Sequence, residues 1–107
     1  MTRGDLVIVA LPGEYGKLQL ALAIQSDAFA EVASLTVLPL TSDLQPTPLV
    51  RITIDPTPAN GLQVRSQIMV DKAVTVPRGR IGRRIGSTDD ATMRRVGEAL
   101  VRFLELE

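Results

Sequence analysis

The sequence predicts a small, mainly β protein that ends in a single helix. From residue 18 to residue 70, apolar and polar residues repeatedly alternate at intervals of two, which is the period of a half-buried strand. Near the C-terminus the period changes, and apolar residues recur at steps of three and four, as one face of a helix requires. Because helices do not alternate with strands, a parallel sheet is not expected.

Five or six short strands, mostly antiparallel, are expected before the helix. An unbroken apolar run predicts the first, and alternation between turn-forming residues predicts most of the others. In order, the predicted strands cover residues 6–11, 18–25, 34–40, 50–54, 62–70 and 74–76. In the second strand, the leucines and Ile24 should face the core, while Gln19, Ala21 and Ala23 should face outward.

The helix is predicted to follow residue 90. Its apolar face would consist of five side chains at helical spacing, namely Met93, Val96, Leu100, Phe103 and Leu104. Just ahead of them, Ser87-x-x-Asp90 has the pattern of a capping box in which aspartate replaces glutamate.

The length of the chain, 107 residues, fits one domain over residues 1–107 and is too short for two. Apolar residues make up 45% of it but aromatic residues only 3%, so the core must be built from Leu, Ile and Val. A domain of this size buries a modest fraction of its surface, so dimerisation would add to its stability.

Charge and residue usage exclude several kinds of function. The chain has 12 basic and 12 acidic residues, so its net charge indicates no preference for nucleic acid. It has no cysteine and no histidine, and its acids lack the spacing of a metal-binding loop, so no metal or other cofactor is expected. Without a signal-peptide pattern or a bilayer-spanning apolar run, a soluble cytoplasmic protein with no membrane association is expected.

A basic segment is the least even feature of the charge distribution. Arg78, Arg80, Arg83 and Arg84 lie close together in the sequence, with no acid between Asp71 and Asp89. Two interpretations stay open at this point: a solvated basic loop and an anion-binding rim.

Known nucleotide, nucleophile and zinc motifs are absent from the sequence. Instead, a series of short blocks runs through nearly the whole chain. They are Arg3-Gly4-Asp5-Leu6-Val7, Gly16-Lys17, Ile24-Gln25-Ser26-Asp27, Thr36-Val37-Leu38-Pro39-Leu40-Thr41-Ser42, Ser66-Gln67-Ile68-Met69-Val70-Asp71-Lys72, Val76-Pro77-Arg78 and Ile81-Gly82. In their order and spacing, these blocks resemble the MazF/PemK family of toxins.

This resemblance implies both a fold and an activity. Members of the family share a small SH3-like or CcdB-like antiparallel barrel with a C-terminal helix. They form homodimers and are neutralised by an antitoxin, here expected to contribute an acidic, partly disordered segment. Most cleave single-stranded RNA at short motifs without a metal, leaving 2′,3′-cyclic phosphate and 5′-hydroxyl ends.

The resemblance also implies which residues form the site. Thr41 matches a catalytic threonine of the family that follows the third strand. Gln19 stands where the family usually has an arginine, so this chain lacks that cation and its activity is expected to be attenuated. Lys17, two residues earlier on the same side of the strand, is a candidate substitute cation. Asp71 stands where some members have a site aspartate, and its alternative role is to cap a turn.

Five further residues are predicted to contact RNA: Ser42, Gln67, Arg78, Arg80 and Arg83. The same arginines are expected to face the antitoxin. An alternative function is a dimeric binding module without catalysis, which binds the antitoxin or inhibits a protein such as DNA gyrase. The C-terminal Leu104-Glu105-Leu106-Glu107 lacks the aromatic-Gly ending of the gyrase inhibitors, which argues against that version.

Overall fold

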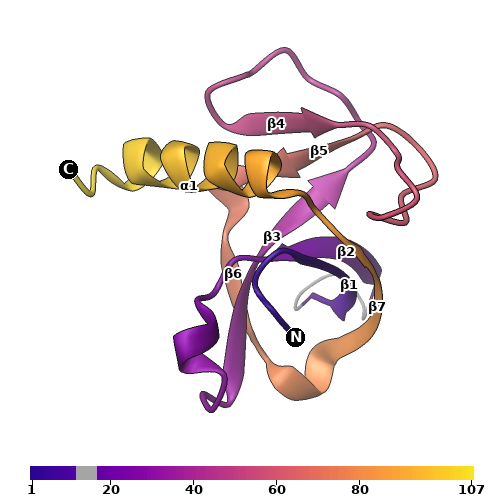
Figure 1. Cartoon of the computed structure of the whole chain (residues 1–107), viewed down its shortest axis with the longest axis vertical. Helices are drawn as coiled ribbons and strands as arrows, with labels where there is room; N and C mark the ends of the chain where they lie inside the picture. The colour runs from indigo at the N-terminus through magenta and orange to yellow at the C-terminus, as the bar shows by residue number, and fades with distance from the viewer. Residues whose placement is uncertain (12–16) are drawn as a thin grey trace.

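The computed structural model describes residues 1–11 and 17–107. In the described part, seven strands form one sheet and a helix follows them (Figure 1). The strands are β1 (Asp5–Ala10), β2 (Leu18–Ala23), β3 (Ser34–Thr41), β4 (Arg51–Ile54), β5 (Ser66–Met69), β6 (Val74–Pro77) and β7 (Ile81–Ser87), and the helix is α1 (Asp90–Leu104). Three short 3-10 turns lie between them: η1 (Asp27–Phe29), η2 (Val70–Lys72) and η3 (Arg78–Arg80).

All strand pairings are antiparallel, and the sheet order is β4-β5-β3-β2-β1-β7. The long strand β3 joins the two parts of the sheet. Its first half pairs with β6, with Leu35 opposite Val76, and its end pairs with β5, with Leu40 opposite Ile68. The predicted fold class, an antiparallel β structure with a C-terminal helix, is confirmed.

One strand, β7, is missing from the prediction. Its sequence, IGRRIGS, has only two large apolar residues, Ile81 and Ile85, and they do not alternate at intervals of two. Its pairing with β1 is also irregular, with register shifts on either side of Val7. The basic segment is therefore not one loop, because it continues through η3 into an edge strand.

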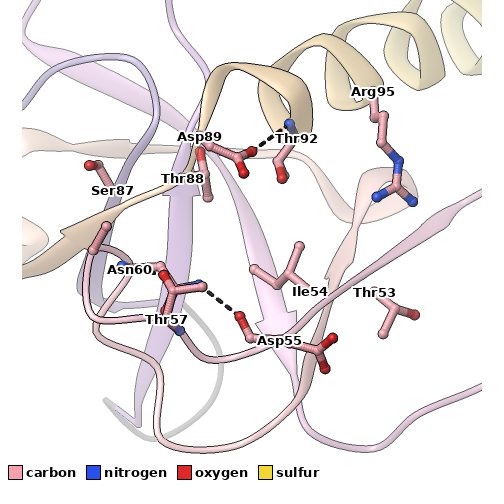
Figure 2. Close-up of a pocket in the computed structure, with 11 residues that line it drawn as sticks. Thr53, Ile54, Asp55, Thr57, Asn60, Ser87, Thr88, Asp89, Thr92 and Arg95 are labelled. Carbon is pink, nitrogen blue, oxygen red and sulfur yellow. Dashed lines mark hydrogen bonds between the residues drawn. The ribbon is translucent and has the colours of Figure 1, made fainter.

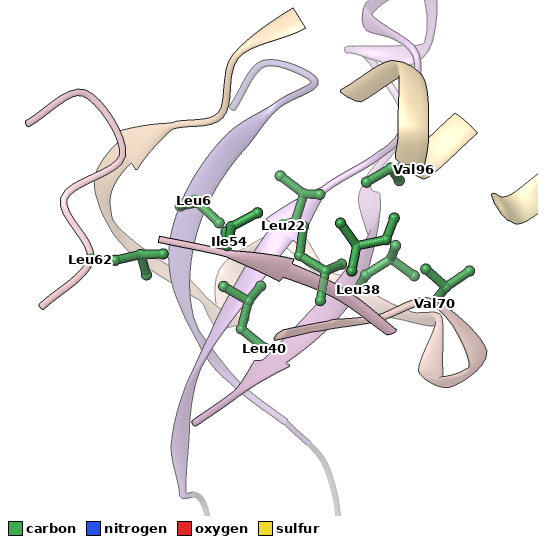
Figure 3. Close-up of a cluster of buried hydrophobic side chains, with 10 residues drawn as sticks. Leu6, Leu22, Leu38, Leu40, Ile54, Leu62, Val70 and Val96 are labelled. Carbon is green, nitrogen blue, oxygen red and sulfur yellow. The ribbon is translucent and has the colours of Figure 1, made fainter. Parts of the chain in front are cut away.

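The larger core lies between the sheet and α1 (Figure 3). It is built from aliphatic side chains, as the composition predicts, and α1 contributes the buried Val96. Its buried members are Leu6, Leu22, Leu38, Leu40, Ile52, Ile54, Leu62, Ile68, Val70 and Val96.

A second core fills the opposite face of β1, β2 and β3. Its buried members are Val7, Val9, Ala21, Ala23, Leu35, Val37 and Val76. The prediction that Ala21 and Ala23 face outward is therefore wrong, since both are fully buried. A sheet with cores on both faces buries its central strands on both sides, and the small alanine side chains fit the restricted space there.

The helix begins as an N-capped element, but its cap differs from the prediction. Ser87 ends β7, and Asp89 is the cap, with its carboxylate accepting a hydrogen bond from the Thr92 N–H at 2.7 Å. Hydrogen bonding from the Thr92 side chain and, after it, from the Thr92 N–H lowers the pKa of the Asp89 carboxyl. At the other end, Phe103 and Leu104 are 47% and 54% exposed, because α1 extends past the sheet (Figure 1).

Two close backbone contacts hold the loop before β5 against β7. The Ser87 N–H donates to the Ala59 carbonyl at 2.9 Å. Gly61 has a φ of +71°, and a Cβ there would overlap the Ile85 carbonyl oxygen. This position therefore requires glycine for both its backbone conformation and its close approach.

Candidate functional site

Polar side chains form a row across four neighbouring strands at one end of β3. Thr41 of β3 pairs with Gln67 of β5, and Gln67 pairs with Thr53 of β4. On the other side, Ala21 of β2 pairs with Pro39, so the same register continued by two residues places Gln19 opposite Thr41. Cross-strand partners point to the same face of a sheet. We call Gln19, Thr41, Gln67 and Thr53 the polar row.

Gln19 lies at the β2 end of this row. Its side chain is half-buried, and its Nε2 donates to the carbonyl of Leu40 at 3.0 Å. Leu40 directly precedes Thr41, so the Gln19 amide lies beside the threonine that the resemblance places in the site. Lys17 is exposed just before β2 begins.

Thr41 is the last residue of β3, and its hydroxyl is already partly engaged. Its Oγ1 accepts a hydrogen bond from the Asp43 N–H at 3.0 Å. A hydroxyl has one proton to donate and two lone pairs, so this bond occupies one lone pair and leaves the proton available. Ser42, the next residue, is exposed.

Gln67 is 6% exposed, and its amide is fully used inside the protein. Its Oε1 accepts from the Gln45 N–H at 2.9 Å and from Arg51 Nη1 at 3.3 Å. Its Nε2 donates to the Gln45 carbonyl at 3.0 Å and to Thr53 Oγ1 at 3.1 Å. These four bonds satisfy the amide completely. A direct contact of Gln67 with RNA stays a prediction, while the structure gives it a holding role.

Asp71 lies in η2, beyond the end of β5, and the structure does not bring it into the polar row. Its Oδ2 is 3.9 Å from Lys72 Nζ, a long ion pair in which the lysine is exposed and the aspartate is partly buried. Its Oδ1 is buried and has no hydrogen-bond partner within the described residues. The predicted catalytic role of Asp71 stays a prediction.

The arginines of the basic segment are dispersed over the surface. Arg78 Nε donates to the Val32 carbonyl at 2.6 Å, and its N–H donates to the Ala33 carbonyl, next to the start of β3. Thr41 ends the same eight-residue strand, about 23 Å away at 3.3 Å per residue. Arg84 forms an ion pair with Asp5 at 2.9 Å, whereas Arg80 and Arg83 are exposed. In a single chain, Arg78 therefore does not share the end of β3 where the polar row lies.

Two surface hollows lie beside the polar row, and sequence reasoning predicted neither. A cavity of about 590 Å³ separates the end of β4 from the start of α1, with Thr53 and Arg95 among the residues that line it (Figure 2). A smaller hollow is lined by Gln45, Arg51, Thr53, Gln67 and Arg95, among others. Only the cross-strand register could have drawn attention to Arg51 and Thr53, because neither belongs to a motif.

Comparison with known proteins decides the family. A family model described as PemK-like, MazF-like toxin of type II toxin-antitoxin systems matches residues 2–104. The chain belongs to this family. It is also 45% identical, over 105 residues, to a protein of Mycolicibacterium smegmatis named probable endoribonuclease MazF. These residues cover 97% of this chain and 96% of that relative. The chain is thus a MazF-type toxin, as the sequence blocks indicate.

Solved structures of MazF proteins share the fold. The toxin MazF-mt6 of Mycobacterium tuberculosis has a TM-score of 0.82 at 22% identity, over 96% of this chain and 98% of that one. A mycobacterial endoribonuclease, solved in complex with its cognate antitoxin, has a TM-score of 0.83 at 20% identity, over 100% of this chain and 97% of that one. A MazE-MazF structure from Deinococcus radiodurans has a TM-score of 0.79 at 16% identity, over 100% of this chain and 98% of that one.

Two searches of the described residues gave negative findings. No helix there has the length and apolar character needed to cross a bilayer. No group of three or more acidic side chains is arranged there as a metal-binding site.

Proposed function

We propose that this chain is an endoribonuclease that cleaves single-stranded RNA by attack of the RNA's own 2′-hydroxyl. Family membership and the relative named as a probable endoribonuclease support the activity. The observation that carries the proposal to particular residues is the polar row, because it brings Gln19 and Thr41 to one face of adjacent strands.

The reaction needs donors more than it needs a protein nucleophile. The 2′-oxygen forms a bond to the adjacent phosphorus while the bond to the 5′-oxygen breaks. The 2′-hydroxyl gives up its proton and the 5′-oxygen takes one, so the ends are a 2′,3′-cyclic phosphate and a 5′-hydroxyl. The phosphorane carries extra negative charge, which fixed hydrogen-bond donors stabilise. Thr41, with a free proton, and the Gln19 amide are such donors.

Because the phosphorane carries extra negative charge, an uncharged Gln19 at this position makes the toxin a weak catalyst. An amide donates a hydrogen bond but brings no charge to the phosphorane, unlike the arginine usual at this position in the family. Losing a transition-state donor commonly costs about 10²–10³ in rate. Lys17, exposed just before β2, is the nearest candidate to supply part of the missing charge.

The assembly follows from the family and from the exposed apolar end of α1. We propose that the 107-residue domain works as a homodimer, held inactive by a cognate antitoxin with an acidic, partly disordered segment. Its substrate is single-stranded mRNA, and its action therefore lies in the cytoplasm. No cofactor takes part in the proposed reaction.

Cleavage and mapping of the ends test the proposal. The protein and its Gln19→Arg variant are incubated with a long single-stranded RNA in EDTA, and the cut ends are mapped. Cyclic phosphate and 5′-hydroxyl ends at a recurring short motif are expected from both, more slowly from the wild type. If neither protein cuts the RNA, the proposed ribonuclease activity is refuted. The alternative function, a non-catalytic binding module, is then favoured.

A further inference from the structure

The segment that follows Thr41 is held by a network of side chains that includes Gln67 of the polar row and Arg51 of β4. We propose that Arg51 and Gln67 are positioning residues for the cleavage reaction, and that they act by fixing the Thr41 hydroxyl as a hydrogen-bond donor. This inference rests on the proposed function, because it assigns both residues a supporting task in that reaction.

The first step of the argument is the turn at Thr41. The Asp43 N–H occupies one lone pair of Thr41 Oγ1, so the hydroxyl proton must point elsewhere. Threonine is stiff about χ1, so the direction of this hydroxyl depends on where the Asp43 N–H lies. A group that bonds the Asp43 carbonyl restrains the backbone of Asp43, and it therefore also limits the direction in which Thr41 donates.

Arg51 is that group. Its Nη1 donates to the Asp43 carbonyl at 2.9 Å and also to Gln67 Oε1 at 3.3 Å. One nitrogen thereby joins the turn to the buried amide of β5. Arg51 forms no ion pair with a carboxylate among the described residues, so its guanidinium is committed to these neutral oxygens.

Gln67 anchors the other end of the network. Its amide bonds both the N–H and the carbonyl of Gln45, as a neighbouring strand would do. Gln45 Nε2 in turn lies 3.3 Å from both oxygens of the Asp43 carboxylate. The loop between β3 and β4 is thus held at two residues, Asp43 and Gln45, just beyond Thr41.

The buried position of Gln67 makes this arrangement rigid. A buried amide with four satisfied bonds loses several of them at once if it moves, which costs far more than moving an exposed side chain. Catalysis depends on such pre-organisation, since small displacements of a reacting group reduce the rate strongly.

A double-mutant cycle distinguishes positioning from general support. Single-turnover cleavage is measured for the wild type, Arg51→Met, Thr41→Val and the double variant, with the single-stranded RNA saturating. Arg51→Met should slow cleavage about tenfold in the wild type but less than about twofold in Thr41→Val, because its effect passes through Thr41. The RNA concentration needed for half-maximal rate should change little.

A second measurement examines the turn itself without RNA. Amide hydrogen exchange at Asp43 and Gln45 should quicken in Arg51→Met and in Gln67→Leu, while Val37, in the centre of β3, stays protected. Arg94→Met is the matched control, since Arg94 is exposed on α1 and has no ion pair in the described part of the chain. It should change neither exchange nor cleavage.

Each outcome bears on a different claim. A wild type that cleaves, with equal losses from Arg51→Met in both backgrounds, would overturn the positioning role alone. Unchanged exchange at Asp43 would do the same. A failure of both the wild type and Gln19→Arg to cleave would overturn the proposed function, and the positioning role would fall with it.

Discussion

Replacing Gln19 by arginine should turn this toxin into a faster ribonuclease. The Gln19 amide nitrogen is 3.0 Å from the carbonyl of Leu40, the residue before Thr41, so a guanidinium built from this position reaches the same place. There it would add a fixed positive charge beside a phosphorane whose extra negative charge exists only in the transition state.

The size of the gain follows from charge and burial. Two unit charges about 4 Å apart gain about 4 kcal/mol at an effective dielectric constant near 20. Gln19 is only half-buried, so water screens part of this attraction, and we expect about half of it. About 2 kcal/mol corresponds to an acceleration of about thirtyfold.

Single-turnover cleavage in EDTA measures this acceleration directly. Gln63→Arg is the matched control, because it adds the same charge at an exposed position outside the polar row. If Lys17 is the substitute cation, adding Lys17→Ala should lower the cleavage rate of the wild type more than that of the Gln19→Arg variant. Equal rates for wild type, Gln19→Arg and Gln63→Arg would refute the idea that this position lacks a catalytic cation.

Three further results are expected. Light scattering at micromolar concentration should give a dimer, and a clean monomer would contradict the assembly. Alanine at Arg78, Arg80 and Arg83 together should weaken both RNA and antitoxin binding, and unchanged affinities would mean that these arginines are only solvated or structural. Asp89→Ala should lower the melting temperature at neutral pH. Because the folded pKa of Asp89 is lowered, this difference should persist above the carboxyl's ordinary pKa and disappear as the pH falls through the lowered value; a difference constant with pH would contradict it.

The features predicted correctly from the sequence are those with a local pattern. Alternation located β2 and β4, and the change of period located α1, because in each of them the large apolar side chains repeat on the side that faces the larger core. The errors arose where an element's surroundings are not local. Ala21 and Ala23 are small enough to suit either water or a tight core, so only the second core decides that they are buried.

The candidate site shows the same contrast between what a local pattern predicts and what depends on distant parts of the chain. The resemblance singled out Gln19 and Thr41 one at a time, and the register of β2 on β3 brings them together. The basic segment looks continuous in sequence, but one arginine bonds the loop before β3 and another pairs with Asp5, so its members separate. Proximity along the chain was therefore a poor guide to a shared surface.

The residues that sequence reasoning could not assign are those that connect distant segments. Gln67 reaches Gln45 across 22 positions and Arg51 across 16, and neither spacing belongs to a recognisable motif. Gln67 shows what a motif match leaves out: its burial and four internal bonds indicate a supporting role that no spacing in the sequence predicts, while its contact with RNA stays a prediction. In the positioning role proposed above, the cross-strand partner that completes the fold would also set the direction in which the Thr41 hydroxyl donates. Changes at Arg51 or Gln67 should therefore reduce cleavage through Thr41, not through loss of RNA affinity.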